Sequence, residues 1–240
     1  MTNAECWSYG GGVQSAAVAV LVVTGKLPSP EHIVIADTGR EAQTTWDYMA
    51  NVIEPYLGRK ITVASHELAT VDLFSGNGDL LMPMFTGSGK LPTFCSTEWK
   101  RRVVHRQLRA LGVESCRLWI GISVDEVARA KPSSVGWIEH RFPLLMDFPM
   151  RRAECISLVR AAGLPDPPRS SCWCCPHRQN DEWRVLPAEE FAKAVALEAE
   201  LREKDPDVYL HRDRVPLAQV DLSPERQADL FGECDGYCWT

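Results

Sequence analysis

The sequence predicts an α/β fold, a Rossmann-like parallel sheet flanked by helices, with a small cysteine-bearing extension at the C-terminal end. Two observations support this prediction. Residues 4–8 have the pattern of a strand, Gly10-Gly11-Gly12 follows it, and apolar residues over 15–23 then recur with helical spacing. A second apolar run, residues 32–36, completes a strand–turn–helix–strand unit, and such a unit implies a parallel sheet.

The later elements are predicted from apolar spacing and from Pro and Gly at their ends. In chain order they are helix 41–53, strand 59–65, a loop rich in Gly, Met and Pro over 70–94, helix 98–111, strand 116–122, helix 149–162 and helix 188–203. A proline-rich connector over 164–171 separates the last two helices. We therefore expect a nucleotide-binding domain over residues 1–165 and the extension, packed on it, over 166–240.

The composition excludes several classes of protein. The longest apolar run, residues 16–23, is far shorter than the ~20 residues that a membrane span requires. The N-terminus lacks the pattern of a signal peptide, so we expect a cytoplasmic protein that does not contact a membrane. The net charge of −6 gives no global argument for nucleic-acid binding, although it leaves room for a local basic groove. Nine cysteines without an export signal favour metal binding or redox chemistry over disulfides.

The glycine turn is the first candidate site. A helix N-terminus presents unpaired N–H groups and a partial positive charge, and glycines let a phosphate approach the backbone. The turn is neither a Walker A loop nor a GxGxxG loop, and the alternative is a tight turn that binds nothing. A second polar loop follows the next strand, and parallel sheets bind ligands at the carboxyl ends of their strands. The predicted nucleotide-binding residues are Ser8, Gly10, Gly11, Gly12, Gln14, Ser15, Asp37, Thr38 and Gly39.

Five segments in the same order resemble the PP-loop family of adenine-nucleotide α-hydrolases, in its phosphoadenosine-phosphosulfate (PAPS) reductase-like branch. They are SYGGGVQS, IADTGREAQTTWDY, CSTEWK, GISVDEVAR and SCWCCP, and the resemblance covers about residues 5–185. Val13 stands where many PP-loops carry a lysine, and PAPS reductases lack that lysine too.

The resemblance implies an ATP pyrophosphatase that uses Mg²⁺ and adenylates an acceptor for sulfur transfer. The implied acceptor is a nucleic acid, as in DNA phosphorothioation or tRNA thiolation. A sulfur donor such as a cysteine desulfurase and partner proteins of a modification complex are implied as well. Lys100 and Arg129 are then expected to neutralise charge during catalysis. Two alternatives remain open: a sulfonucleotide reductase, and a non-catalytic subunit that binds a nucleotide and a cluster.

The cysteines are the second candidate site. Cys172 and Cys175 form a CxxC pair, and Cys95 and Cys155 are predicted to complete a set of four ligands for a 4Fe–4S cluster or, alternatively, zinc. Cys174 is a rival fourth ligand, and the alternative to all of these is a set of buried reduced thiols. Near the C-terminus, Cys234 resembles the catalytic tail cysteine of PAPS reductases, although the residues after it, up to Cys238, depart from that tail.

A basic segment is the last feature. Its cationic side chains recur with helical spacing, so most are expected on one face, which either binds polynucleotide phosphates or is simply solvated. These residues are Lys100, Arg101, Arg102, His105, Arg106 and Arg109.

Overall fold

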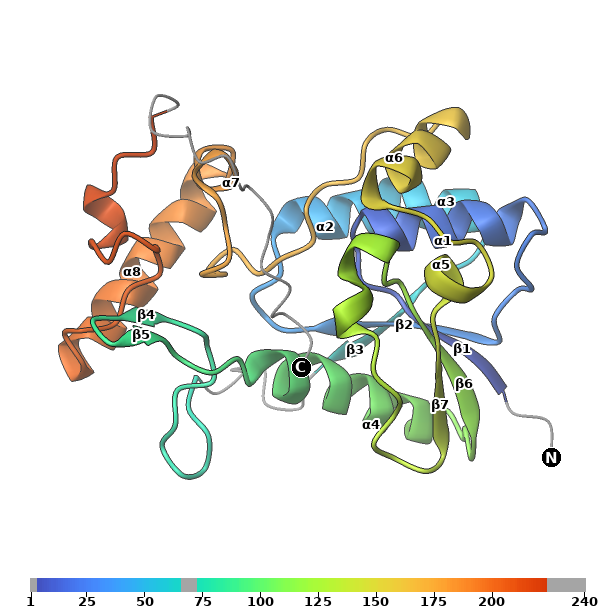
Figure 1. Cartoon of the computed structure of the whole chain (residues 1–240), viewed down its shortest axis with the longest axis horizontal. Helices are drawn as coiled ribbons and strands as arrows, with labels where there is room; N and C mark the ends of the chain where they lie inside the picture. The colour runs from blue at the N-terminus through green and yellow to red at the C-terminus, as the bar shows by residue number, and fades with distance from the viewer. Residues whose placement is uncertain (1–3, 66–72, 224–240) are drawn as a thin grey trace.

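A five-stranded parallel sheet forms the centre of the molecule in a computed structural model, which describes residues 4–65 and 73–223 (Figure 1). The strand order is β3-β2-β1-β6-β7, and every neighbouring pair is parallel. The strands are β1 (Ala4–Ser8), β2 (His32–Asp37), β3 (Thr62–Ser65), β6 (Cys116–Ile120) and β7 (Ile138–Arg141). The predicted α/β fold is thus confirmed, with one edge strand, β7, that the sequence analysis did not include.

Helices cover both faces of this sheet (Figure 1). On one face α1 (Val13–Val23) packs against α3 (Glu54–Leu57), α5 (Pro143–Met146) and α6 (Arg152–Ala161). The segment before α3 is also helical, as α2 (Gln43–Tyr48) followed by the π-helix η1 (Met49–Ile53). On the other face the π-helix η2 (Ser96–Arg101) runs into α4 (Arg102–Ala110), which packs on β2 and β3. No helix in the described ranges is both long and apolar enough to span a membrane.

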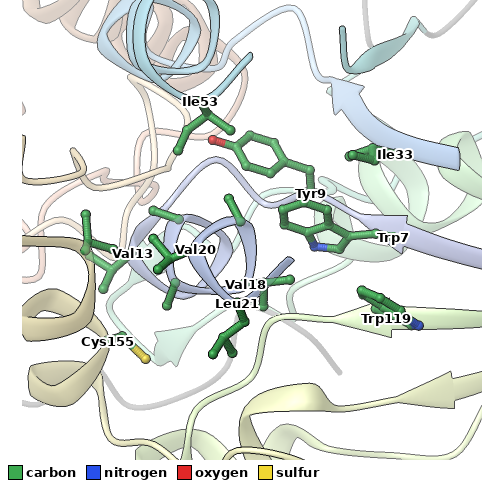
Figure 2. Packing of buried hydrophobic residues seen from close by; sticks show 14 of the residues in the cluster. Trp7, Tyr9, Val13, Val18, Val20, Leu21, Ile33, Ile53, Trp119 and Cys155 are labelled. Carbon is green, nitrogen blue, oxygen red and sulfur yellow. The ribbon is translucent and has the colours of Figure 1, made fainter. Parts of the chain in front are cut away.

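The alternation of side chains along β1 fixes the two layers of the core. Trp7 and Tyr9 point toward α1 and are almost fully buried (Figure 2). Cys6 lies on the opposite face, in the cluster that includes α4. Because both faces are covered, β2 carries four consecutive buried apolar residues, 33–36, as is typical of strands in parallel sheets.

A third apolar cluster lies beside the sheet, where Figure 1 shows α8 and a short hairpin. The hairpin, β4 (Phe85–Thr86) and β5 (Gly89–Lys90), falls within the predicted loop. It packs with α7 (Asn180–Arg184), α8 (Ala188–Lys204) and the 3₁₀ turn η4 (Leu217–Gln219). Residues after 165 therefore share their core with residues 73–99 from the middle of the chain.

The topology places three loops at one edge. β1 lies between β2 and β6, and the chain leaves it for β2 on one side and returns to β6 on the other. The carboxyl ends of these strands lead into residues 9–12, 38–42 and 121–123. This change of direction in the strand order is where open α/β sheets bind ligands.

Candidate functional site

The glycine turn after β1 forms a tight loop at the start of α1. The Gly10 N–H donates to the Ser15 hydroxyl at 2.8 Å. Gly11 has φ +77°, and a Cβ there would lie only 2.5 Å from the buried methyl of Thr45. Gly12, the residue before α1, has no side chain with which to cap the helix. The first-turn N–H groups of α1 are therefore left to solvent or to an anion.

Gln14 extends from α1 toward the loop after β6. Its amide nitrogen donates to Ser123 at 3.3 Å and to Glu126 at 3.0 Å. Glu126 lies in the 3₁₀ helix η3 (Val124–Arg129) and also forms an ion pair with Arg129. The structure thus joins Gln14 and Arg129 in one network, in which the Arg129 charge already has a carboxylate partner.

The loop after β2 connects the nucleotide edge to the cysteines. Asp37 is half-buried, and its carboxylate accepts the Gly39 N–H at 2.7 Å. Thr38 is fully buried, with its hydroxyl 3.4 Å from the sulfur of Cys172. A residue expected to bind nucleotide therefore contacts a residue expected to bind a cluster.

The segment that precedes the CxxC pair is hydrogen-bonded onto this loop. The Ala42 N–H donates to the Ser171 carbonyl at 3.2 Å, and the Trp173 N–H donates to the Arg40 carbonyl at 2.8 Å. The Ser170 hydroxyl contacts the Gly10 carbonyl and lies 3.1 Å from the carboxylate of Glu41. Residues 171–173 are therefore held against the loop after β2, and Ser170 against the glycine turn.

Glu41 is the central acidic group of this edge. Its side chain is 3% exposed and its carboxylate lies 3.2 Å from the ammonium nitrogen of Lys100. Burial disfavours the charge of Lys100, but Glu41 and the thiolates of Cys172 and Cys175 outweigh that effect and raise the pKa of Lys100. Lys100 is therefore a fixed cation between the carboxylate and the cysteines.

Three of the four predicted cluster ligands come together. The Cys175 N–H donates to the Cys172 carbonyl at 3.0 Å, which closes a turn over the CxxC pair. Cys95 precedes η2 and lies close enough that the charges of Cys172 and Cys175 raise its pKa. Burial is the larger cause, and together these effects raise the pKa of Cys95 to about 12. Burial, followed by the charge of Glu41, raises the pKa of Cys172 to about 11.

The structure does not bring Cys155, the predicted fourth ligand, to this group. Cys155 is fully buried on α6 in the apolar core against α1, where Figure 2 shows it near Leu21 and Val13. The rival, Cys174, is also fully buried but adjoins Cys172 and Cys175, whose charges add to the effect of burial and raise its pKa. Cys234 and Cys238 lie outside the described residues.

Within the described ranges, no group of three or more His, Cys, Asp or Glu side chains has the arrangement of a single metal-ion site. Thiolates that share one zinc ion lie about 4 Å apart, because each Zn–S bond is about 2.3 Å long and the geometry is tetrahedral. Cys95, Cys172 and Cys175 are therefore neighbours without the close spacing that a single ion requires.

Two residues of the site were not assigned a role from sequence. Glu41 belongs to the motif after β2, and its position at the carboxyl edge was the available signal. Ser170 stands two residues before the CxxC pair, and no local pattern indicates its contact with Gly10.

No protein-family model and no curated protein sequence matches the chain. Among solved structures, the fold is similar to the U34-tRNA thiolase NcsA from Methanococcus maripaludis with its 4Fe–4S cluster. The TM-score is 0.50 at 14% sequence identity, and the match covers 85% of this chain and 67% of that chain. At this identity the similarity establishes the fold.

Proposed function

We propose that the chain is a PP-loop ATP pyrophosphatase that activates an acceptor for sulfur transfer. The observation that supports this proposal is the docking of the cysteine segment on the glycine turn, through Ser170 at Gly10, and on the loop after β2, through Cys172 at Thr38. Two chemistries that the sequence analysis predicts separately, phosphate binding and thiolate binding, then operate at one edge of the sheet. The similarity to a thiolase structure agrees with this combination.

In this proposal the chain contributes mainly positioning and electrostatics. The first-turn N–H groups of α1 bind phosphate, and Gly11 allows the close approach. Lys100 is held toward the cysteines by Glu41. Mg²⁺ usually binds through one or two carboxylates together with substrate phosphates, and half-buried Asp37 is a carboxylate placed to hold it. The ion supplies neutralisation of the phosphate charge.

We assign Cys95, Cys172 and Cys175 to a 4Fe–4S cluster rather than to zinc, because the similar thiolase structure carries such a cluster. The neighbouring Lys100 and the buried Arg178 offset thiolate charge. A cluster held by these three cysteines alone would leave one iron able to bind sulfur.

The test uses protein purified under anaerobic conditions and incubated with Mg-ATP, alone and with tRNA or DNA. AMP and pyrophosphate are the expected products, and a Gly11→Ala variant should form neither, because its turn is deformed at the phosphate site. ADP and phosphate, or no turnover with every acceptor, would contradict the proposal. A parallel incubation with PAPS and a thiol reductant would identify a sulfonucleotide reductase by the release of sulfite.

A further inference from the structure

A cavity opens on the α4 face of the sheet, beside the glycine turn. Because side chains alternate along a strand, Ser8 lies on the same face as Cys6, opposite Trp7. With Leu118 and Ile120 of β6, Ser8 lines the cavity on the side of the sheet, and Val104 and His105 line it from α4. The cavity borders the strand that leads into the phosphate loop, and no cysteine is among its lining residues in the described ranges, although Ser96 and Thr97, which follow Cys95, line it.

The walls of this cavity carry positive charge. Arg101 from η2 and Lys131 from the loop after η3 line it, and so does Arg129 from η3, whose charge is paired with Glu126. The residues that line it within the described ranges include no carboxylate. Burial, followed by the charge of Arg101, lowers the pKa of His105 to about 4, so this imidazole is neutral at neutral pH.

Two buried polar atoms in these walls are unpaired. Nε2 of His105 and Nε of Arg129 have no hydrogen-bond partner in the part of the chain that the structure describes. Buried polar groups in folded proteins are normally satisfied, by a ligand or by ordered water where the protein itself does not satisfy them. The cavity therefore combines an apolar floor with a cationic rim, and two polar groups in its walls lack a partner in the described part of the chain.

The positive charge continues outside the cavity along α4. Arg102 and Arg106, four residues apart, form an exposed ridge next to the ridge of Arg101 and His105 that lines the cavity. Arg102 forms an ion pair with Glu98, so Arg106 carries the net positive charge of this ridge. Lys100, which the sequence analysis placed on the same face, instead contacts Glu41 on the cysteine side. The predicted basic stripe is thereby divided between the cysteine site and the cavity with its ridge.

We propose that this cavity receives one nucleotide of a single-stranded polynucleotide, which is the acceptor of the activated group. The base lies against the apolar floor, while phosphates on either side contact Lys131, Arg101 and the Arg106 ridge. A mononucleotide would not use the ridge, whereas a phosphodiester chain needs cations beyond the cavity. The inference rests on the proposed function, because the acceptor must lie beside the nucleotide that activates it.

The experiment measures binding of short fluorescent oligonucleotides by anisotropy, without ATP, over a range of salt concentrations. RNA and DNA of one sequence are compared as single strands, as duplexes and as abasic single strands. Wild-type protein should bind single strands, and removal of the bases should weaken binding about tenfold. Lys131→Gln and Arg106→Gln should each weaken binding several-fold and reduce the slope of log affinity against log salt by about 0.7.

The matched control is Lys193→Gln, which removes one exposed cation from α8 and should leave oligonucleotide binding unchanged. The inference is overturned if wild-type protein does not bind at low salt, if abasic strands bind equally well, or if all three variants behave alike. It is also overturned if ATP displaces the oligonucleotide and Lys131→Gln weakens ATP binding as much as it weakens oligonucleotide binding. In that case the cavity would be the ATP site. If the expected binding pattern appears without any ATP turnover, the cavity assignment stands and the proposed ATP chemistry fails.

Discussion

Replacement of Glu41 by Gln tests the electrostatic arrangement of the site. The substitution keeps the volume of the side chain and retains an oxygen that can accept from Ser170, but it removes the negative charge. The Lys100 ammonium, 3.2 Å from that carboxylate, then loses its partner while remaining largely desolvated. The variant should therefore fold but be less stable than the wild-type protein.

The size of the effect follows from the burial of the two groups. Breaking a fully buried ion pair by removing one partner costs about 3–5 kcal/mol. Lys100 keeps a quarter of its side chain exposed while Glu41 keeps 3%, so water relieves part of the penalty. We expect a loss of about 2 kcal/mol in the free energy of unfolding. The same change at the solvent-exposed pair Glu189–Lys193 should cause no measurable loss.

The assay is equilibrium unfolding in urea at pH 7.5 with reduced, metal-free protein, followed by circular dichroism. Lys100→Met and the double variant Glu41→Gln/Lys100→Met complete the cycle. Because the double variant leaves no unpaired charge, it should be more stable than the sum of the single changes predicts, by about 1–2 kcal/mol. Additive losses, or a Glu41→Gln variant as stable as Glu189→Gln, would refute this account of the pair.

Three other perturbations test different parts of the molecule. Gly11→Ala should cost about 3 kcal/mol in urea unfolding, because its Cβ would lie 2.5 Å from a buried methyl of α2. The control is Gly25→Ala, at φ +72°, where a Cβ would have no described atom within 4 Å and the substitution should cost about 1 kcal/mol. If Gly11→Ala and Gly25→Ala lost the same stability, the clash at Gly11 would be contradicted. The pKa of His105 is lowered from 6.5 to about 4, so its contribution to stability is present above pH 6.5 and is lost as the pH falls through 4. Unfolding measured at pH 7 and pH 4 should show that His105→Gln loses about 2 kcal/mol less than wild type on acidification, and parallel losses would argue against this role. After anaerobic reconstitution with iron and sulfide, Cys95→Ser should lose most bound iron while Cys155→Ser keeps it, and a folded Cys155→Ser variant without iron would restore Cys155 as a ligand.

The parallel sheet could be predicted because its strands carry a local signal. Segments 4–8 and 32–36 are apolar, are bounded by turn residues and are separated by an apolar helix, and the structure places them as β1 and β2. β7 was not predicted because its four residues, Ile-Glu-His-Arg, include only one buried side chain, Ile138. An edge strand of this kind gains its hydrogen bonds from β6, and no pattern in its own residues reveals that pairing.

The site could be predicted only where chain order determines position. Loops that follow parallel strands must meet at the carboxyl edge, which is why the turns at Gly10 and Asp37 lie together. The contact of Ser170 with Gly10 joins residues 160 positions apart, and nothing local encodes it. The expectation for Cys155 overlooked helical spacing: Cys155 and Val159 are four apart and both fully buried, the pattern of a core face on α6.

The two cations of the candidate site are already paired with carboxylates, so other groups must neutralise the phosphate charge of ATP. Lys100 and Arg129, the two groups expected to neutralise phosphate charge, are bound to Glu41 and Glu126, so each pair brings no net charge to the nucleotide. The positive charge must then come from Mg²⁺ and from the N-terminus of α1. The Glu41→Gln variant, although less stable, frees the Lys100 charge and should bind ATP more tightly than wild type when EDTA removes Mg²⁺. Calorimetric titration with and without Mg²⁺ measures this difference, and an unchanged or weaker affinity in EDTA would show that Lys100 does not act on the phosphates.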